Sequence, residues 1–490
     1  MKGLVRYMVR NRAALLWTIG GIVLVTVLWW LVFGLWLDML HLQWKWFTRV
    51  FLGRFLFPGG ANVFKMSPWA MLFIGIGLLV TYVVKSGNAR RLHDRFSYSY
   101  SYGRSPLEAP EVGAAAKNIR TAMLVAGCLL LTASAFFFAA GSNDKAASYA
   151  PSTTFVVADA DKVPSSLNRL VEGGAQSEDC DVAADHGMPG CITEGEFNGL
   201  WYTRTASAAG AKIVLKRTSG TVTNTELLGN TLSYVYDDKG DGVWTAIRDG
   251  KNKQPIYGIV SWSGSGNPEQ CRFDGEYKLD QAFGGKWGTN LSDTIAAKFP
   301  GLFYEDSDMW GYCDGDEPVV VIPVTEQENY EHRVTFRSSG VLVMKGSPSG
   351  VPSFQHITDV EPGDFGGPVY PASLVDEQRD GINMMAGRVN KWFRKFGYET
   401  LDIKTQEGNA SDYLLRSKTD DRLYWVTPMK PRGSDSQLVV AYSVTPADNA
   451  SHGQLNEQKV YVLSDDDPRI VNLDDLEARV KEAVITANPG

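Results

Sequence analysis

The chain has 490 residues and a formal net charge of −7 at pH 7. This charge is divided unevenly, because residues 1–141 carry 15 Lys and Arg against 4 Asp and Glu, whereas residues 142–490 carry 33 against 51. The acid excess of the second part argues against nucleic-acid binding there, since it would repel phosphate.

Three segments in the first third of the chain are long and apolar, namely residues 13–37, 68–84 and 121–141. A bilayer core about 30 Å thick needs roughly 20 helical residues to cross it. The segments therefore predict three transmembrane helices within a membrane domain of residues 1–141. The first is too long and too rich in tryptophan to be a signal peptide.

Residues 42–57, between the first two spans, interleave aromatic and basic side chains. Such a mixture is typical of the boundary between lipid and water, so the sequence predicts an interfacial helix lying on the bilayer. The alternative is a helix that packs on a partner's spans. The residues expected to contact the membrane are Trp44, Lys45, Trp46, Arg49 and Arg54.

Lys and Arg are concentrated in the N-terminal tail and in residues 85–120, between the second and third predicted spans. Basic loops stay in the cytoplasm. We therefore expect a protein of the cell membrane with a cytoplasmic N-terminus and, after three spans, an extracytoplasmic C-terminal domain.

After a small, polar linker at residues 142–152, the pattern changes to short helices and strands. Strands are expected at residues 211–217, 232–236, 243–248, 256–262, 318–324, 423–427, 437–444 and 459–463. A hairpin is expected at 332–345, and helices at 290–299, 374–396 and 473–485. This order predicts an α+β fold with mainly antiparallel sheets. Two subdomains, 153–350 and 351–490, are expected on either side of a Gly/Ser/Pro-rich run.

Four of the five cysteines lie in the predicted outer domain: Cys180, Cys191, Cys271 and Cys313. An even number in an exported domain suggests two disulfides. Pairing of sequence neighbours is the simplest arrangement. The alternatives are four buried free thiols or, around Cys180 and Cys191, a zinc site.

Six acidic residues surround a Trp-Gly-Tyr-Cys sequence: Glu305, Asp306, Asp308, Asp314, Asp316 and Glu317. Carboxylates this dense repel one another unless water or a cation offsets their charge. They are candidate cation ligands, and the alternative is a solvated acidic face.

Residues 363–368, Gly-Asp-Phe-Gly-Gly-Pro, resemble the GDSGGP signature of trypsin-like serine proteases. In that family the serine is the nucleophile. Phe365 stands at this position and cannot attack a carbonyl, so the resemblance does not imply protease activity. A glycine-rich turn explains the motif. The sequence contains no P-loop, GxGxxG or HExxH motif, and no cofactor is predicted.

The leading hypothesis is a non-enzymatic envelope protein whose spans assemble with other membrane proteins, or with further copies of this chain, and whose outer domain binds a ligand. The alternative is a membrane-tethered envelope hydrolase that uses paired carboxylates. A third hypothesis is a sensor that passes an outer signal to the cytoplasmic segments.

Overall fold

The computed structural model describes residues 67–83, 110–171, 191–464 and 470–471, except for 198, 203, 205, 219–223, 237–239, 286–288, 331–332, 386, 388–390, 392, 394, 401–411 and 434–437. Four predicted features lie outside the described residues: the first span, the interfacial segment at residues 42–57, Cys180 and the final helix.

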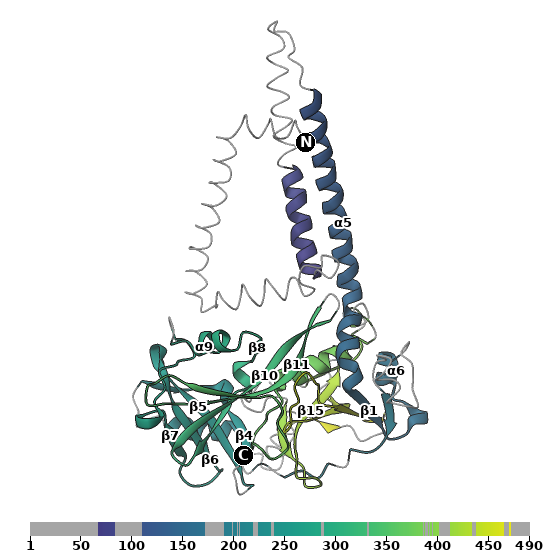
Figure 1. Cartoon of the computed structure of the whole chain (residues 1–490). Helices are drawn as coiled ribbons and strands as arrows, with labels where there is room; N and C mark the ends of the chain where they lie inside the picture. The colour runs from purple at the N-terminus through teal and green to yellow at the C-terminus, as the bar shows by residue number, and fades with distance from the viewer. Residues whose placement is uncertain are drawn as a thin grey trace, which may run out of the picture.

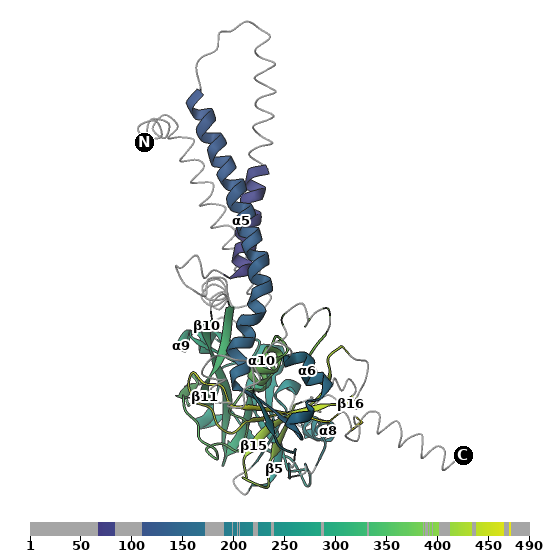
Figure 2. The same cartoon turned by 90° about the vertical axis from the view of Figure 1, so that its right-hand side faces the viewer.

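A helical stalk rises from an α+β part (Figure 1). Its main element is α5, Pro110–Tyr149, a single helix of 40 residues. The segment predicted as a linker continues this helix as far as Tyr149. A second helix, Pro68–Val83, runs beside α5 (Figures 1 and 2).

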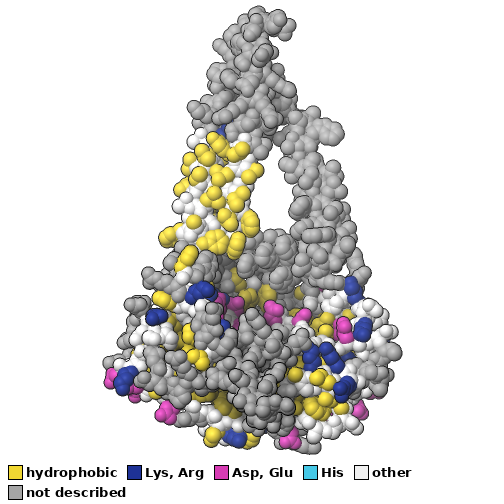
Figure 3. All heavy atoms as spheres, turned by 180° about the vertical axis from the view of Figure 1, so that it is seen from behind, with side chains coloured by type: hydrophobic (Ala, Val, Ile, Leu, Met, Phe, Trp, Pro, Cys, Tyr) yellow, Lys and Arg dark blue, Asp and Glu magenta, His cyan; other side chains and the backbone are white. Residues whose placement is uncertain are grey.

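One described helical segment, Ile119–Phe138, is long and apolar enough to cross a membrane, and Pro68–Val83 is apolar but shorter. Only 11% of the Ile119–Phe138 window is buried inside the protein. Figure 3 shows apolar side chains covering the stalk, whereas charged side chains are spread over the α+β part.

The two stalk helices cross where each carries a glycine. A Cβ added to Gly75 would lie 3.2 Å from the carbonyl oxygen of Gly127, and a Cβ added to Gly127 would lie 3.2 Å from that of Gly75. Close to this crossing, the hydroxyl of Ser134 donates to the Pro68 carbonyl at 2.8 Å. Glycine thus allows the two backbones to approach closely.

The largest sheet has seven strands in the order β13-β15-β17-β18-β1-β2, with β14 also pairing with β15. The β1 strand pairs in parallel with β18 and β2, and the other pairs are antiparallel. Strand β1 precedes residue 350, where the predicted first subdomain ends, and β18 follows it, so this sheet contains strands from both predicted subdomains. The strands are β1 (Thr153–Val157), β2 (Cys191–Glu194), β13 (Tyr398–Thr400), β14 (Tyr413–Arg416), β15 (Leu423–Pro431), β17 (Ala441–Pro446) and β18 (Gln458–Val462).

Two five-stranded antiparallel sheets form the rest of the fold, and β16 (Leu438–Val439) pairs separately with β19 (Ile470–Val471). One five-stranded sheet contains β3 (Thr225–Leu227), β4 (Ser233–Tyr236), β5 (Gly242–Gly250), β6 (Gln254–Trp262) and β7 (Glu269–Arg272). The other contains β8 (Leu302–Phe303), β9 (Trp310–Asp314), β10 (Glu317–Tyr330), β11 (Arg333–Lys345) and β12 (Ser353–Ile357). The expected α+β fold with mainly antiparallel sheets is confirmed.

The two five-stranded sheets pack face to face around a shared apolar core. Ile247 and Ile259 of one sheet meet Val320 and Leu342 of the other, and all four are at most 1% exposed. A disulfide between Cys271 on β7 and Cys313 on β9 joins the sheets, which confirms this predicted pair. Its expected counterpart, Cys180–Cys191, includes a residue outside the described ranges.

Helices cover the remaining apolar faces. The α6 helix (Ser165–Val171) packs on the seven-stranded sheet through Leu167 and Leu170. The α9 helix (Leu291–Lys298) covers the shared core of the sandwich, and α8 (Ala208–Thr218) covers the other face of the β5–β6 sheet. The α10 helix (Ala372–Ile382) lies against the lower part of α5 (Figure 2).

Three local predictions were wrong. Residues 211–217 are helical because Ala208, Ala211 and Leu215 form one buried face at helical spacing. The predicted 332–345 hairpin is the single strand β11, in which Gly340 (φ +77°) lets the backbone of β12 approach. The predicted 374–396 helix ends at Ile382.

Candidate functional site

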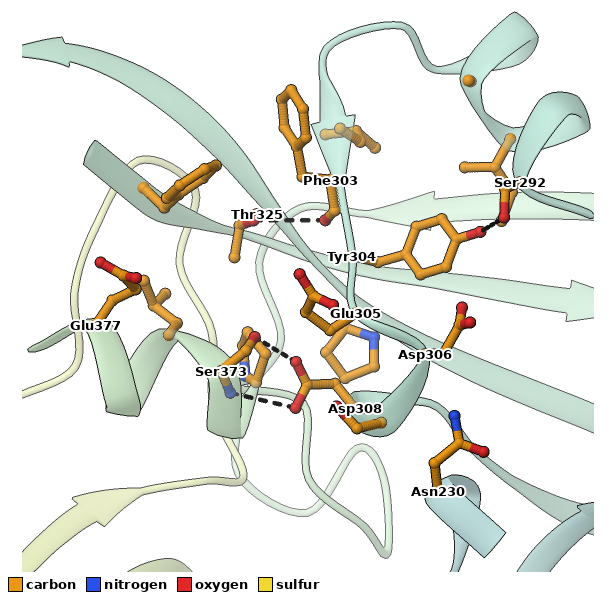
Figure 4. A pocket seen from close by; sticks show the side chains of 18 residues that line it. Asn230, Ser292, Phe303, Tyr304, Glu305, Asp306, Asp308, Thr325, Ser373 and Glu377 are labelled. Atoms are coloured by element: carbon orange, nitrogen blue, oxygen red, sulfur yellow. Dashed lines mark hydrogen bonds between the residues drawn. The ribbon is translucent and has the colours of Figure 1, made fainter. Parts of the chain in front are cut away.

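The candidate site is a pocket of about 610 Å³ at the junction of the sandwich and α10 (Figure 4). Its walls come from α9, from residues 302–308, from the β10 and β11 strands, and from the start of α10. The lining includes Asn230, Ser292, Phe303, Tyr304, Glu305, Asp306, Asp308, Thr325, Phe336, Ser373, Leu374 and Glu377.

Three of the six predicted cation-binding acids line this pocket: Glu305, Asp306 and Asp308. Burial raises the pKa of all three carboxyl groups, and for Glu305 the charge of Asp306 raises it further. The effect is largest at Asp308, which is 7% exposed and has a pKa raised to about 6. Burial in the pocket thus favours the protonated form of the Asp308 carboxyl group.

Asp308 is held by Ser373 at the start of α10. Its Oδ1 accepts from the Ser373 backbone N–H at 3.3 Å, and its Oδ2 accepts from the Ser373 hydroxyl in a short hydrogen bond (Figure 4). These bonds lower the pKa of Asp308 but do not cancel the effect of burial. Asp308 therefore accepts from a backbone N–H in the first turn of α10 that has no partner within the helix. This contact joins the part of the pocket around Asp308 to α10.

Aromatic side chains form another part of the wall. The Tyr304 hydroxyl donates to Ser292 Oγ at 2.6 Å, which links residues 302–308 to α9. Phe303 and Phe336 meet edge to face, with their ring centroids 5.8 Å apart. The pocket thus combines acidic groups with apolar and aromatic surface, a mixture common in small-molecule sites.

The other three predicted acids lie at the opposite end of β9. Asp314, Asp316 and Glu317 surround the turn from β9 to β10, and Glu317 accepts from the Lys345 ammonium at 2.6 Å. Within the described part of the chain, no group of three or more His, Cys, Asp or Glu side chains is placed to hold a metal ion.

The pocket is adjacent to the joint between the stalk and the α+β part. Tyr149, the last residue of α5, is 1% exposed, and its hydroxyl accepts from the Phe336 N–H at 2.8 Å. Arg337 donates to the carbonyl of Ser148 at 3.1 Å and to its hydroxyl at 2.9 Å. The end of α5 is therefore bonded to the β11 strand that forms one wall of the pocket.

A second set of contacts joins α5 to α10. The Lys145 ammonium lies 2.7 Å from Glu377 Oε2 and 2.8 Å from Asp380 Oδ2. Burial lowers the pKa of Lys145, but the two carboxylates raise it more, so the net shift is upward. Because Glu377 also lines the pocket, one side chain contacts both the pocket and the stalk.

No family model, curated protein or solved structure matches this chain.

Two arrangements that resemble serine-protease sites do not provide a catalytic serine. In the Gly363–Pro368 segment, Phe365 packs against the Trp310 cluster, and Gly367 allows the Trp310 ring to approach. Elsewhere, Ser339 Oγ and Glu326 Oε1 lie 3.2 Å and 3.5 Å from the same nitrogen, His452 Nδ1. A Ser–His–acid triad needs the serine and the acid at opposite ring nitrogens, so these residues do not form one.

The sequence analysis identified the acids of the pocket but missed Ser373, Tyr304 and Glu377. The density of carboxylates at residues 305–317 was the only local signal of the site. Ser373 reaches Asp308 from 65 positions further along the chain, and Lys145 reaches Asp380 across 235 positions. Neither contact has a local sequence signature.

Proposed function

We propose that this chain is an integral membrane protein of the cell envelope, whose α+β domain lies outside the cytoplasm and acts in binding or assembly within a membrane complex. The observation that carries the proposal is the continuity of α5. This helix runs without a break from the apolar Ile119–Phe138 segment to Tyr149, which is buried in the domain.

The apolar surface of the stalk supports a membrane location. Val125, Leu129 and Phe136 are 51%, 65% and 65% exposed. Exposure of apolar surface to water costs about 25 cal/mol per Å², so the faces carrying these side chains need lipid or partner helices. Twenty helical residues span about 30 Å, the thickness of a bilayer core.

The crossing at Gly75 and Gly127 supports a second membrane helix at Pro68–Val83. In lipid, helices gain little from burying apolar side chains against each other, so small residues that allow close backbone contact are typical of their interfaces. With the span predicted at residues 13–37, this gives the three-helix membrane domain.

The disulfide supports placement of the domain outside the cytoplasm, because disulfides form mainly in oxidising compartments. The basic residues between positions 85 and 120 support the same orientation, with that loop inside and the acidic domain outside.

Alkaline carbonate extraction tests the membrane location. We expect wild-type protein to stay in the pellet, whereas Leu129→Arg places a charge on the lipid-facing side of α5 and loosens its hold on the membrane. The matched control is Leu200→Arg, at a leucine of the α+β part that is 66% exposed. Release of the wild-type protein by carbonate would contradict the proposal.

Sidedness and assembly need separate measurements. Protease added to intact cells is expected to cleave the α+β domain, and protection that is lost on cell lysis would reverse the orientation. Crosslinking in membranes is expected to capture a partner membrane protein or a second copy of the chain. Consistent recovery of uncrosslinked monomer would contradict assembly into a complex.

A second candidate function, a membrane-tethered hydrolase that uses paired carboxylates, is favoured by the acid-lined pocket. Such chemistry needs one protonated and one ionised carboxyl group, and the raised pKa values of Glu305 and Asp308 provide acids suited to this division. Envelope glycan incubated with the protein would then release reducing ends. Glu305→Gln should abolish the release, and Glu361→Gln, outside the pocket lining, should not. Absence of release by the wild type would reject this function.

A further inference from the structure

A second, smaller pocket lies beyond the end of α10 and is lined by basic side chains. Its volume is about 210 Å³, and its lining consists of Lys391, Lys395, Glu399, Arg432 and Gly433. We propose that this pocket binds the phosphate group of an anionic phospholipid headgroup.

Positive charge in the pocket exceeds negative charge. Lys391, Lys395 and Arg432 contribute three cations, and the one lining carboxylate, Glu399, is already 3.4 Å from the Lys430 ammonium. This local excess of positive charge lies within a second part of the chain that is acidic overall. An anionic group is therefore the ligand whose charge the pocket complements.

Lys391 is the buried basic side chain of the pocket lining. It is 5% exposed and forms an ion pair with Asp380. Burial lowers its pKa, and the charges of Arg432 and Lys145 lower it further, although Asp380 opposes them. A nearby anion would relieve this repulsion between cations.

Arg432 supplies an unused donor. Its NH1 atom is buried and has no hydrogen-bond partner among the described residues, although the Arg432 side chain lines the pocket. A buried donor without an acceptor costs about 1–3 kcal/mol. Arginine is suited to phosphate, since its planar group donates several hydrogen bonds to the oxygens of one anion. A phosphate oxygen would satisfy this donor.

The position of the pocket favours a lipid over free phosphate. Asp380 pairs with both Lys391 and Lys145, which places Lys391 near the C-terminal part of α5. Lys145 follows Phe138 by seven helical residues, so it lies about 10 Å beyond the apolar segment. The headgroup layer extends roughly 5–7 Å beyond the hydrocarbon on each side. Long basic side chains can cover the remaining distance.

The neighbouring residues fit contact with such a layer. Phe393 is 80% exposed, and Lys395 is also exposed. Lys391, Phe393, Lys395 and Phe396 thus place basic and aromatic residues together, a combination typical of interfacial segments. We therefore assign the phosphate to a lipid of the outer leaflet, an assignment that rests on the proposed membrane location and sidedness.

The test uses the full chain in uncharged detergent and native mass spectrometry. Phosphatidylglycerol should bind more tightly than phosphatidylcholine. Lys395→Gln/Arg432→Gln should weaken phosphatidylglycerol binding roughly 25-fold, since each basic side chain near an anionic membrane contributes roughly fivefold. The matched control, Lys251→Gln/Lys253→Gln, removes the same charge from an exposed turn of the β5–β6 sheet and should bind as the wild type does.

Folding is checked by thermal melting of each variant. Lys395→Gln alone changes only an exposed side chain, and Arg432→Lys keeps the charge, so these two provide folded comparisons. Equal phosphatidylglycerol binding by the wild type and the double variant would overturn the proposal. So would inorganic phosphate that binds as tightly as the lipid and depends on the same residues, because the ligand would then come from solution. Carbonate extraction tests the membrane location independently, so a failure of one proposal is distinguishable from a failure of the other.

Discussion

Asp308 provides a quantitative test of the pocket's electrostatics. The carboxyl group is 7% exposed, and its pKa is about 6 instead of the ordinary 3.8. A pKa difference of one corresponds to about 1.4 kcal/mol, so ionisation of Asp308 costs the folded state about 3 kcal/mol. Replacing Asp308 by Asn removes this titration.

The sign of the effect follows from proton binding. Between about pH 4 and pH 6 the folded protein holds a proton on Asp308 that the unfolded chain has lost, so the stability that Asp308 contributes falls as pH rises. The free energy of unfolding of the wild type, minus that of D308N, should therefore decrease by about 3 kcal/mol from below pH 4 to above pH 6.

The measurement is urea unfolding of the full chain in detergent, followed by tryptophan fluorescence across this pH range. Asp316→Asn serves as the control, because it removes a carboxylate from the exposed turn after β9, where water surrounds it. A wild-type-minus-D308N difference that stays constant with pH, or that increases with pH, would refute the assignment of a raised pKa to Asp308.

Three further variants test other contacts. Ser373→Ala removes hydrogen bonding that lowers the pKa of Asp308, so the midpoint of the same pH profile should move upward, and an unchanged midpoint would contradict the contact. Gly381→Ala places a Cβ 2.7 Å from Tyr149 Cβ. This overpacking costs about 1–3 kcal/mol, which should outweigh a helix-propensity gain of about 1 kcal/mol and lower the melting temperature. Gly284→Ala is the control, because its added Cβ meets its nearest atom only at 3.9 Å. Cys271→Ala/Cys313→Ala removes the disulfide that closes a loop between residues 42 positions apart. It should lower the free energy of unfolding, measured by chemical denaturation, by about 4 kcal/mol. Equal stability of wild type and variant under oxidising conditions would show that the bond does not constrain the chain.

Features set by local sequence were predictable. The apolar segment of α5, the buried part of β10 and the β-branched and aromatic run of β6 follow from composition over a few neighbouring residues. Asn290 was expected at the start of α9, and its side chain does accept from the Asp293 N–H at 3.2 Å. The Cys271–Cys313 pair followed from the simplest pairing of neighbours.

Features set by distant contacts were not predictable. The α10 helix ends at Ile382, where the Asn383 side chain accepts from the Tyr398 N–H at 2.8 Å and donates to the Tyr398 carbonyl at 2.7 Å. These bonds to β13 compete with continuation of the helix, and nothing in the apolar spacing of residues 374–396 indicates them. The start of α10 shows the same limit, because its carboxylate partner comes from Asp308 rather than from a neighbouring residue.

The unbroken α5 helix has a geometric consequence for how the domain meets its surroundings. Each helical residue advances the chain by about 1.5 Å and turns it by about 100°. One residue inserted between Phe138 and Lys145 would thus rotate the α+β part about the axis of α5 by more than a quarter turn and move it by only about 1.5 Å along that axis. Four inserted residues would return it to within about 40° of its original orientation, some 6 Å further from the apolar segment. The number of residues in this short stretch therefore sets the direction, around the axis of α5, in which both pockets face.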